Sequence, residues 1–237
     1  MASRNASFHE RGIAGALFAP LKWSFGGLLL LLALIVAAWI IDWVFVFKVW
    51  PNGLERLQSL LEQDLARAAR LWDSYREFPR FATATANFLY AMLFKVTGIH
   101  DMGARFADGA ARSIPDTVVR NTYIANFEAI QVAMVGTQLF GVRLAALAMT
   151  TPIFALAYCV ASVDGLAQRA IRRASGGRES ASLYHRAKYL QVVALVGGSA
   201  ATLLLPMSID PLWISLPLGF VPAILARVQW VFYKKHL

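Results

Sequence analysis

The apolar residues of this chain come in long uninterrupted blocks, unlike the alternating or striped patterns of soluble domains. One block begins near Trp23, and three more occupy the C-terminal half. About 20 consecutive apolar residues are enough for a helix to cross the hydrocarbon core of a bilayer. We therefore predict an all-α integral membrane protein with about four transmembrane helices, at residues 23–47, 141–164, 189–207 and 212–233.

The segments between these blocks differ in length and in polarity. The largest is expected to be a helical region that separates the first two spans and continues into the second. The others are a short N-terminus, a basic loop and a short tail. Their residues are 48–140 for the helical region, 1–22 for the N-terminus, 165–188 for the loop and 234–237 for the tail.

The helical region starts with an amphipathic pattern over Leu54–Trp72, in which Asp64 and Arg67 lie one turn apart as a local pair. We expect Pro79 to end this helix. The apolar residues of the helix recur at helical spacing: Leu54, Leu57, Leu61, Leu65, Ala68 and Trp72.

The remainder of this region contains a second apolar helix and a long helix that enters the membrane. Phe81–Val96 is apolar but short for a span, so we expect a buried or interfacial helix. Gly98–Arg112 has three glycines and is predicted to be a loop. A helix is expected to begin at Ser113–Asp116 and to continue to about Ala170, interrupted only by Pro152.

Basic residues set the expected orientation. The interval Asp164–Lys188 carries six basic residues against two acidic ones. Lys and Arg near the ends of spans are retained in the cytoplasm. The N-terminus and the Lys234–Lys235 tail are also basic, so both termini and the loop are predicted to be cytoplasmic. Residues 48–140 then lie on the outer side of the membrane, which in a bacterial inner membrane is the periplasm, and the first span is interpreted as an uncleaved signal anchor.

The composition agrees with a membrane protein. Of 237 residues, 58% are hydrophobic and only 16% are charged. The net charge of +9 admits nucleic acid as a partner, but a topological bias with anionic lipid explains it more simply. The single cysteine, Cys159, lies in an apolar block and is interpreted as a packing residue.

Four ionisable residues lie in or at the ends of the spans: Asp42, Arg143, Asp164 and Arg227. Charges at membrane depth are costly, so each should have a partner or lie near an interface. Depth along the helices predicts that Asp42 neighbours Arg143 at the outer face. It also predicts that Asp164 neighbours Arg227 at the inner face. Anchoring of helix ends is favoured over an ion path, because none of the four reaches mid-membrane.

The motifs of catalysis and metal binding are missing from the sequence. The four histidines are scattered, and no His or Cys residues have metal-ligand spacing. Ser199, in a Gly-Gly-Ser-Ala run, is interpreted as a helix-packing residue because no histidine lies in the same span. We expect no enzyme activity, no cofactor and no metal.

The basic loop carries a specific pattern, DGL-x-QR-x-IRR-x-x-GGRESAS-x-x-YHRAK, from Asp164 to Lys188. This pattern, with the Trp50–Gly53 turn and the four-span layout, resembles a family of membrane proteins encoded in integrating conjugative elements and conjugative plasmids. The resemblance implies a non-enzymatic inner-membrane component of conjugative DNA transfer, associated with a type IV secretion system. Members are typically encoded beside the coupling protein, a hexameric ATPase, so the expected role is partner or anchor of that ATPase.

The arginine-rich loop is the predicted docking surface. It would contact an acidic face of the ATPase, with indirect involvement of nucleic acid and with homo-oligomers as a further expectation. The competing interpretation is a small transporter or channel that forms an oligomeric pore; the lack of repeated broken helices speaks against it. The residues proposed for partner contact are Arg172, Arg173, Arg178, Glu179, Tyr184 and His185.

Overall fold

The structure is a computed structural model that describes residues 24–71, 77–107, 114–176, 181–208 and 211–233. Within these ranges all regular secondary structure is helical. By its internal contacts the chain divides into two units, Met1–Ala37 and Ala38–Leu237.

The helices follow one another with short connections. The first helix, Ser24–Val49, ends in a π-helical turn, η1 (Phe45–Val49). The others are α2 (Gly53–Leu71), α3 (Glu77–Tyr90) with the π-helical turn η2 (Ala91–Lys95), α4 (Ile99–Ala107), α5 (Ile114–Ala125), α6 (Phe127–Ala174), α7 (Ala181–Leu204) and α8 (Pro211–Val231).

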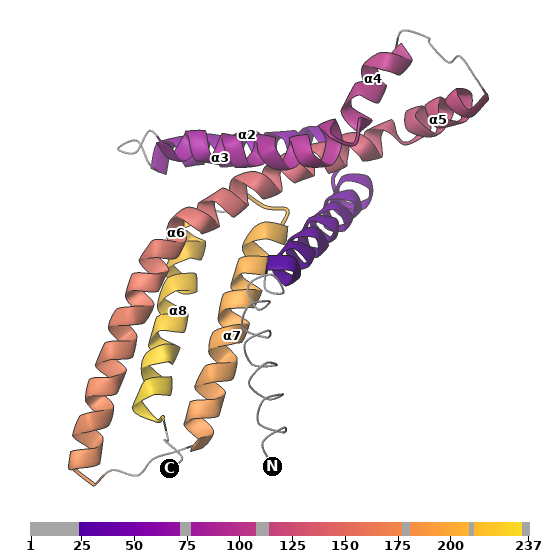
Figure 1. The fold of residues 1–237 in the computed structure, drawn as a ribbon. Coiled ribbons are helices and arrows are strands. Elements are labelled where there is room, and N and C mark those ends of the chain that lie inside the picture. The colour runs from indigo at the N-terminus through magenta and orange to yellow at the C-terminus, as the bar shows by residue number, and fades with distance from the viewer. Residues whose placement is uncertain (1–23, 72–76, 108–113, 177–180, 209–210, 234–237) are drawn as a thin grey trace, which may run out of the picture. The chain divides into compact units, whose positions relative to one another are not determined.

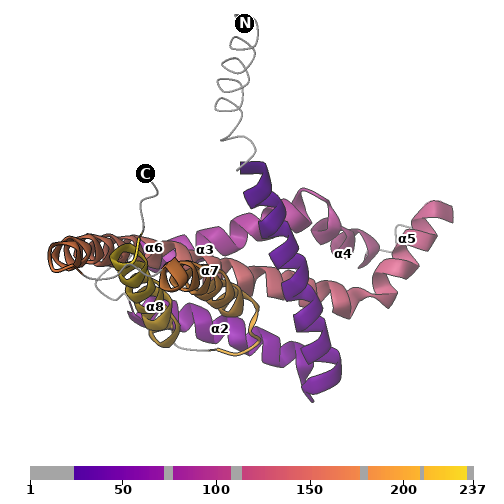
Figure 2. The same ribbon diagram turned by 90° about the horizontal axis from the view of Figure 1, so that it is seen from below.

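In the second unit, α6 links two groups of helices. Its N-terminal part packs against α2 and α3, which lie side by side (Figure 1). Its C-terminal part packs along α8, and α8 in turn packs on α7. Figure 2 shows these last three helices nearly end-on, with α2 and α3 running across their direction. We call α2, α3 and the start of α6 the crosswise layer.

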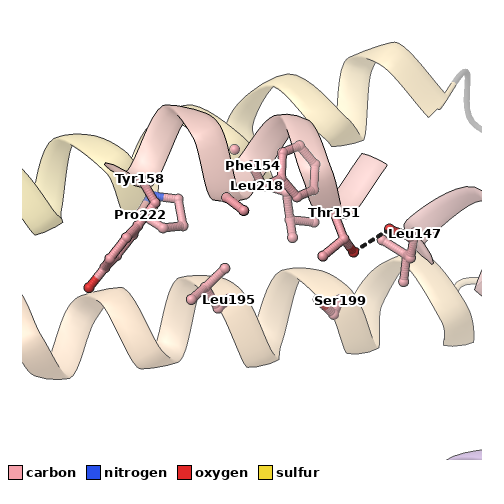
Figure 3. Close-up of a pocket in the computed structure, with 10 residues that line it drawn as sticks. Leu147, Thr151, Phe154, Tyr158, Leu195, Ser199, Leu218 and Pro222 are labelled. Atoms are coloured by element: carbon pink, nitrogen blue, oxygen red, sulfur yellow. Dashed lines mark hydrogen bonds between the residues drawn. The ribbon is translucent and has the colours of Figure 1, made fainter. Parts of the chain in front are cut away.

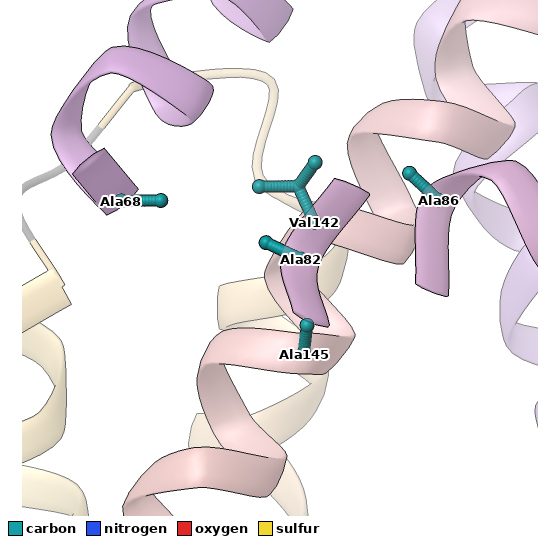
Figure 4. Close-up of a cluster of buried hydrophobic side chains, with 5 residues drawn as sticks. All are labelled: Ala68, Ala82, Ala86, Val142 and Ala145. Carbon is teal, nitrogen blue, oxygen red and sulfur yellow. The ribbon is translucent and has the colours of Figure 1, made fainter. Parts of the chain in front are cut away.

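Small side chains hold the crosswise layer together. Ala82 and Ala86 of α3 pack on Val142 and Ala145 of α6 (Figure 4). A Cβ atom at Gly141 would lie 2.6 Å from the Cα of Ala86, so the two backbones are nearly in contact. Alanine and glycine permit this approach, as in other closely packed helix pairs.

Larger apolar side chains form a second cluster, where α2, the end of the first helix and α6 meet. Leu57 of α2 and Val132 of α6 are completely buried in it. The indoles of Trp39 and Trp43 also donate hydrogen bonds to α6, at 2.9 Å to Thr137 Oγ1 and to the Ala129 carbonyl oxygen. Residues 38–49 are therefore fixed to α6 by both apolar and polar contacts.

Burial along α6 changes abruptly. Its buried residues lie between Val132 and Ala145, and after that stretch only Gly165 is buried among the described residues of the helix. On the side away from α8, several of the intervening apolar residues are exposed, for example Leu156 and Val160. A long helix with exposed apolar residues outside its helix contacts is typical of a membrane-spanning helix.

Three of the described helices are long and apolar enough to cross a membrane: Ser24–Val49, Phe127–Ala174 and Ser182–Leu204. They contain most of the first three predicted spans. The apolar part of α8 that the structure describes, Leu216–Val231, is shorter. The fourth span therefore stays a prediction.

Several element predictions were correct and others were wrong. The amphipathic helix of 54–72 is α2, although Trp72 lies outside the described residues. Pro79 lies in the first turn of α3 and does not end α2, a position where proline costs no hydrogen bond.

The predicted loop at 98–112 contains helix α4. Of its glycines, Gly98 takes a left-handed conformation, with φ of 75°, immediately before the helix begins. Phe106 of α4 is buried against Tyr123 of α5, with ring centroids 5.7 Å apart. Tertiary packing thus outweighs the glycine content of this segment.

The predicted unbroken helix from residue 113 to about 170 is interrupted at Asn126. This residue leaves helical geometry, at φ −111° and ψ 14°, and separates α5 from α6. Its side-chain Nδ2 donates to the Thr122 carbonyl oxygen at 2.8 Å, a local bond that competes with the helix. Pro152, in contrast, lies inside α6 without ending it. Ser113 lies outside the described residues.

Candidate functional site

Arg143 is the centre of a buried polar cluster in the crosswise layer. Its Nε donates to Asp64 Oδ2 of α2 at 2.9 Å, and both side chains are at most one-tenth exposed. Its Nη1 and Nη2 donate to the carbonyl oxygens of Leu205 and Met207, at 2.5 and 3.0 Å. Ser208 Oγ donates to the other Asp64 oxygen at 2.6 Å. We call this set the Arg143 cluster; it joins α2, α6 and the turn between α7 and α8.

Asp42, predicted to neighbour Arg143, is buried beside Gly136 of α6. A side chain at Gly136 would collide with the Asp42 carboxylate. The carboxylate interacts electrostatically with Arg143, as predicted for neighbours, but the ion-pair partner of Arg143 is Asp64. The expected local pairing of Asp64 with Arg67 is likewise replaced by bonds to Arg143 and Ser208.

The sequence held a signal for this cluster. Asp64 follows Leu57 by seven residues and precedes Ala68 by four, so the three residues lie on the same face of α2. Leu57 and Ala68 are both buried. A carboxylate in the apolar stripe of an amphipathic helix needs a buried partner, since an unpaired buried charge is very unfavourable. The position of Asp64 in the apolar stripe therefore indicated a partner from a distant part of the chain, and not the neighbouring Arg67.

The predicted inner pair is present. Arg227 Nε donates to Asp164 Oδ2, which joins α8 to α6. The close approach of the two helices explains the pairing: a Cβ at Gly165 would lie 2.7 Å from the Arg227 carbonyl oxygen. Both side chains are about half exposed, so this pair is far less enclosed than Arg143 with Asp64.

Beyond the inner pair, arginines of α6 stack on aromatic rings at the end of α8. The Arg169 guanidinium carbon lies 5.1 Å from the ring centroid of Tyr233, and that of Arg172 lies 4.2 Å from the centroid of Phe232. Such cation–π contacts hold the guanidinium groups against the rings. Tyr184 of α7 completes the contact, with its ring 5.6 Å from Tyr233. We call this region the arginine–aromatic end.

The predicted partner-contact residues are thus partly brought together. Arg172 and Tyr184 are half-buried in the arginine–aromatic end, and Arg173 and His185 are exposed beside it. His185 contacts Tyr184 edge to face, at 5.2 Å between centroids. Arg178 and Glu179 lie outside the described residues. Sequence reasoning missed Phe232 and Tyr233, which lie at the end of the predicted fourth span.

A groove of about 290 Å³ lies between α6, α7 and α8 (Figure 3). Its lining is mostly apolar and includes Leu147, Phe154, Leu195 and Ser199. The neighbouring Gly198 packs against Leu218 of α8, as expected for a small-residue helix face, since a Cβ there would lie 2.9 Å from Leu218 Cδ1.

Tyr90 connects α3 with α4 and α6. Its hydroxyl lies 2.6 Å from His100 Nδ1, and it also contacts the Met134 sulfur at 3.9 Å. Burial raises the pKa of Tyr90 above its ordinary value, with smaller contributions from Tyr123 and Asp101. The phenol therefore stays protonated and available for this bond.

Comparison with known proteins identifies the family. A family model described as IncC plasmid conjugative DNA transfer protein DtrJ-like matches residues 49–232. No curated protein and no solved structure matches the chain. The matched range runs from the end of the first helix to the end of α8, so it contains both the Arg143 cluster and most of the arginine–aromatic end. It confirms the resemblance to proteins of conjugative elements. This chain belongs to the DtrJ-like family of conjugative DNA transfer proteins.

Proposed function

We propose that this chain is a non-enzymatic inner-membrane component of the conjugation machinery that anchors the coupling-protein ATPase of a type IV secretion system. Membership of the DtrJ-like family gives the role in conjugative DNA transfer. The resemblance to proteins encoded beside the coupling protein supports the choice of partner. The observation that carries the proposal is the arginine–aromatic end, because it presents oriented guanidinium groups outside the apolar part of the helices.

The length of α6 supports this placement. Its 48 residues span about 72 Å at 1.5 Å per residue. The uncharged run Leu144–Val163 has 20 residues, about the length that crosses the hydrocarbon core. Ten helical residues follow Asp164, and Arg172 and Arg173 lie in the last turn. These arginines would stand about 15 Å beyond the membrane boundary.

The chemistry of this end favours a protein or phosphate partner over simple charge bias. A topological signal requires only positive charge. Arg172 instead lies with its guanidinium carbon 4.2 Å from the Phe232 ring centroid, and the planar guanidinium group suits bidentate contact with carboxylate or phosphate groups. We therefore assign ATPase contact to Arg172, Arg173, Tyr184 and His185, with Arg178 and Glu179 of the connecting loop.

The orientation can be tested separately. We propose that both termini and the loop after Gly176 face the cytoplasm. A reporter that is active only in the cytoplasm, inserted after Gly176, should be active, and one that is active only in the periplasm should be silent. The reverse pattern would place the arginine–aromatic end outside and remove the proposed ATPase contact.

The decisive experiment changes the two arginines of the last α6 turn. Arg172→Ala with Arg173→Ala should reduce both co-purification of the coupling protein in mild detergent and DNA transfer, at unchanged protein level. The matched control is Arg172→Lys with Arg173→Lys, which keeps the charge but loses the planar fork. If the arginines serve only topology, the lysine variant transfers normally; if they dock the ATPase, it is impaired as well.

The same purification separates the competing function. Recovery of a hexameric ATPase with the wild-type chain supports the anchor. Recovery of a homo-oligomer that conducts ions in liposomes, with no ATPase, would support an oligomeric pore instead. Normal transfer by the double alanine variant would remove the docking role of Arg172 and Arg173.

A further inference from the structure

Helix α3 has two apolar faces, and only one of them is covered. Ala82, Ala86 and Leu89 are buried, the first two against α6. On another side of the same helix, Phe88 is 62% exposed, and beyond η2 Val96 is 74% exposed. Four large apolar side chains of α3, η2 and the residue after it are exposed, Phe81, Phe88, Met92 and Val96, and we call them the α3 apolar stripe.

The stripe occupies one side of the helix. Phe81, Phe88 and Met92 are spaced by seven and four residues, which places them on one face. Thr83 and Asn87 are also exposed, but they lie on the other side of the buried face from the α3 apolar stripe. Exposed residues of α3 are thus sorted into an apolar side and a polar side, as in helices that lie at the boundary between water and lipid.

The packing of α3 fixes its height relative to the membrane. Ala82 and Ala86 pack on Val142 and Ala145 of α6. These two positions flank Leu144, where the uncharged run of α6 begins. Since that run is just long enough to cross the hydrocarbon core, α3 is held at the level where α6 enters the bilayer. The α3 apolar stripe therefore lies at the outer boundary and not far out in solvent.

We propose that α3 and η2 lie in the interfacial layer of the bilayer, with the α3 apolar stripe inserted among the lipids. The occupant of this face is the lipid surface itself. Exposed apolar side chains at this depth are removed from water by lipid, which stabilises each of them. Lys95, exposed at the end of η2, is placed to reach lipid phosphate with its flexible stem. The crosswise layer would thereby be a membrane-resting platform, whatever partner the opposite end of the protein binds.

Site-directed fluorescence in proteoliposomes tests this placement. In a Cys159→Ser background, Phe88→Cys and Asn87→Cys variants of the full chain are each labelled with an environment-sensitive dye. They are reconstituted into phosphatidylcholine–phosphatidylglycerol vesicles with or without brominated acyl chains. We expect bromine quenching at position 88 to exceed that at position 87 by about twofold or more, with a blue-shifted emission at 88. Aqueous iodide should show the opposite preference.

Every outcome at position 88 decides the proposal. Efficient iodide quenching with little bromine quenching would mean that the stripe faces water. Protection from both quenchers would mean that a second copy or another protein covers it. Either result overturns the lipid assignment. If Phe88→Cys does not fold, as judged by its elution from size exclusion, Phe81→Cys on the same stripe is labelled instead and compared with Thr83→Cys.

Discussion

Two of the ion pairs that join distant helices in the described part of the chain use the same chemistry in opposite surroundings. Arg143 and Asp64 are about one-tenth exposed, and the remaining donors of Arg143 bind the carbonyl oxygens of the α7–α8 turn. Arg227 and Asp164 are about half exposed, and they adjoin arginines that stack on aromatic rings. The first pair is enclosed by the fold, whereas the second borders a surface that other molecules can reach.

Burial determines what each pair contributes. Removing one partner of a buried pair leaves an uncompensated charge, so the fold depends on both partners being present. An exposed pair gains little net free energy, because water and salt screen it. The comparison indicates that the Arg143 cluster maintains the structure, and that the inner pair beside the arginine–aromatic end contributes less to it. Four measurements of stability test this difference between the two regions.

The largest effect is expected at Arg143. Arg143→Met should lower the free energy of unfolding by about 3–5 kcal/mol, because Asp64 would remain buried without its cation. Thermal unfolding in detergent measures this loss. The control is Arg105→Met, which removes an exposed pair with Asp116 in the same region and should have almost no effect. Equal stability of the two variants would contradict the structural role of the Arg143 cluster.

The next effect concerns the close approach of α3 and α6. Gly141→Ala should cost about 1–3 kcal/mol, because its new methyl group would overlap Ala86. Gly197→Ala is the matched control, since a Cβ there meets no atom within 4 Å. Alanine is also the better helix former, so the control should be neutral or slightly stabilising. The two melting temperatures should therefore move in different directions or by clearly different amounts.

A smaller effect is expected at the inner pair. Asp164→Asn should change the free energy of unfolding by about 1 kcal/mol or less, because both partners are half exposed. The value is measured in the same detergent as Arg143→Met. A loss as large as that of Arg143→Met would show that both ends are structural, and the contrast between them would disappear.

An effect of similar size is expected at Tyr90. Tyr90→Phe removes the bond to His100 and should cost about 0.5–1.5 kcal/mol. The raised pKa of Tyr90 also gives a pH dependence: the neutral phenol stabilises the fold below the ordinary value of 10.0, and this contribution is lost as the pH rises through the folded value. Stability measured between pH 8 and 11 should therefore fall less steeply for Tyr90→Phe than for the wild type.

The sequence predicted those features that depend on local pattern or on depth. Long apolar blocks predicted helices long enough to cross a membrane, three of which are present in the described residues, and helical spacing predicted α2. The counting of turns from each membrane face predicted the pairing of Asp164 with Arg227, because both residues lie at the ends of adjacent apolar helices. The short apolar segment 81–96 was likewise correctly predicted to be a helix, and its buried or interfacial placement stays a prediction.

Features that depend on contacts between distant segments could not be predicted in this way. Arg143 and Asp64 are 79 residues apart, and two further acceptors come from backbone carbonyls, which have no sequence signature. The stacking of Arg172 on Phe232 requires the C-terminal end of α6 to lie beside the C-terminal end of α8. This depends on how far the two helices are shifted along one another, which the sequence pattern does not give. The break at Asn126 depends on one side-chain hydrogen bond, which helical periodicity does not reveal.

The Arg143 cluster also has a consequence for biogenesis. Asp64 and Arg143 are synthesised well before the carbonyl groups at Leu205 and Met207. A chain still emerging from the ribosome can form the ion pair between Arg143 and Asp64. The Nη1 and Nη2 donors of Arg143 gain their acceptors only after the turn between α7 and α8 has been synthesised. The Arg143 cluster therefore cannot be complete until that turn has been synthesised, and a chain truncated before Leu205 would lack two acceptors of Arg143.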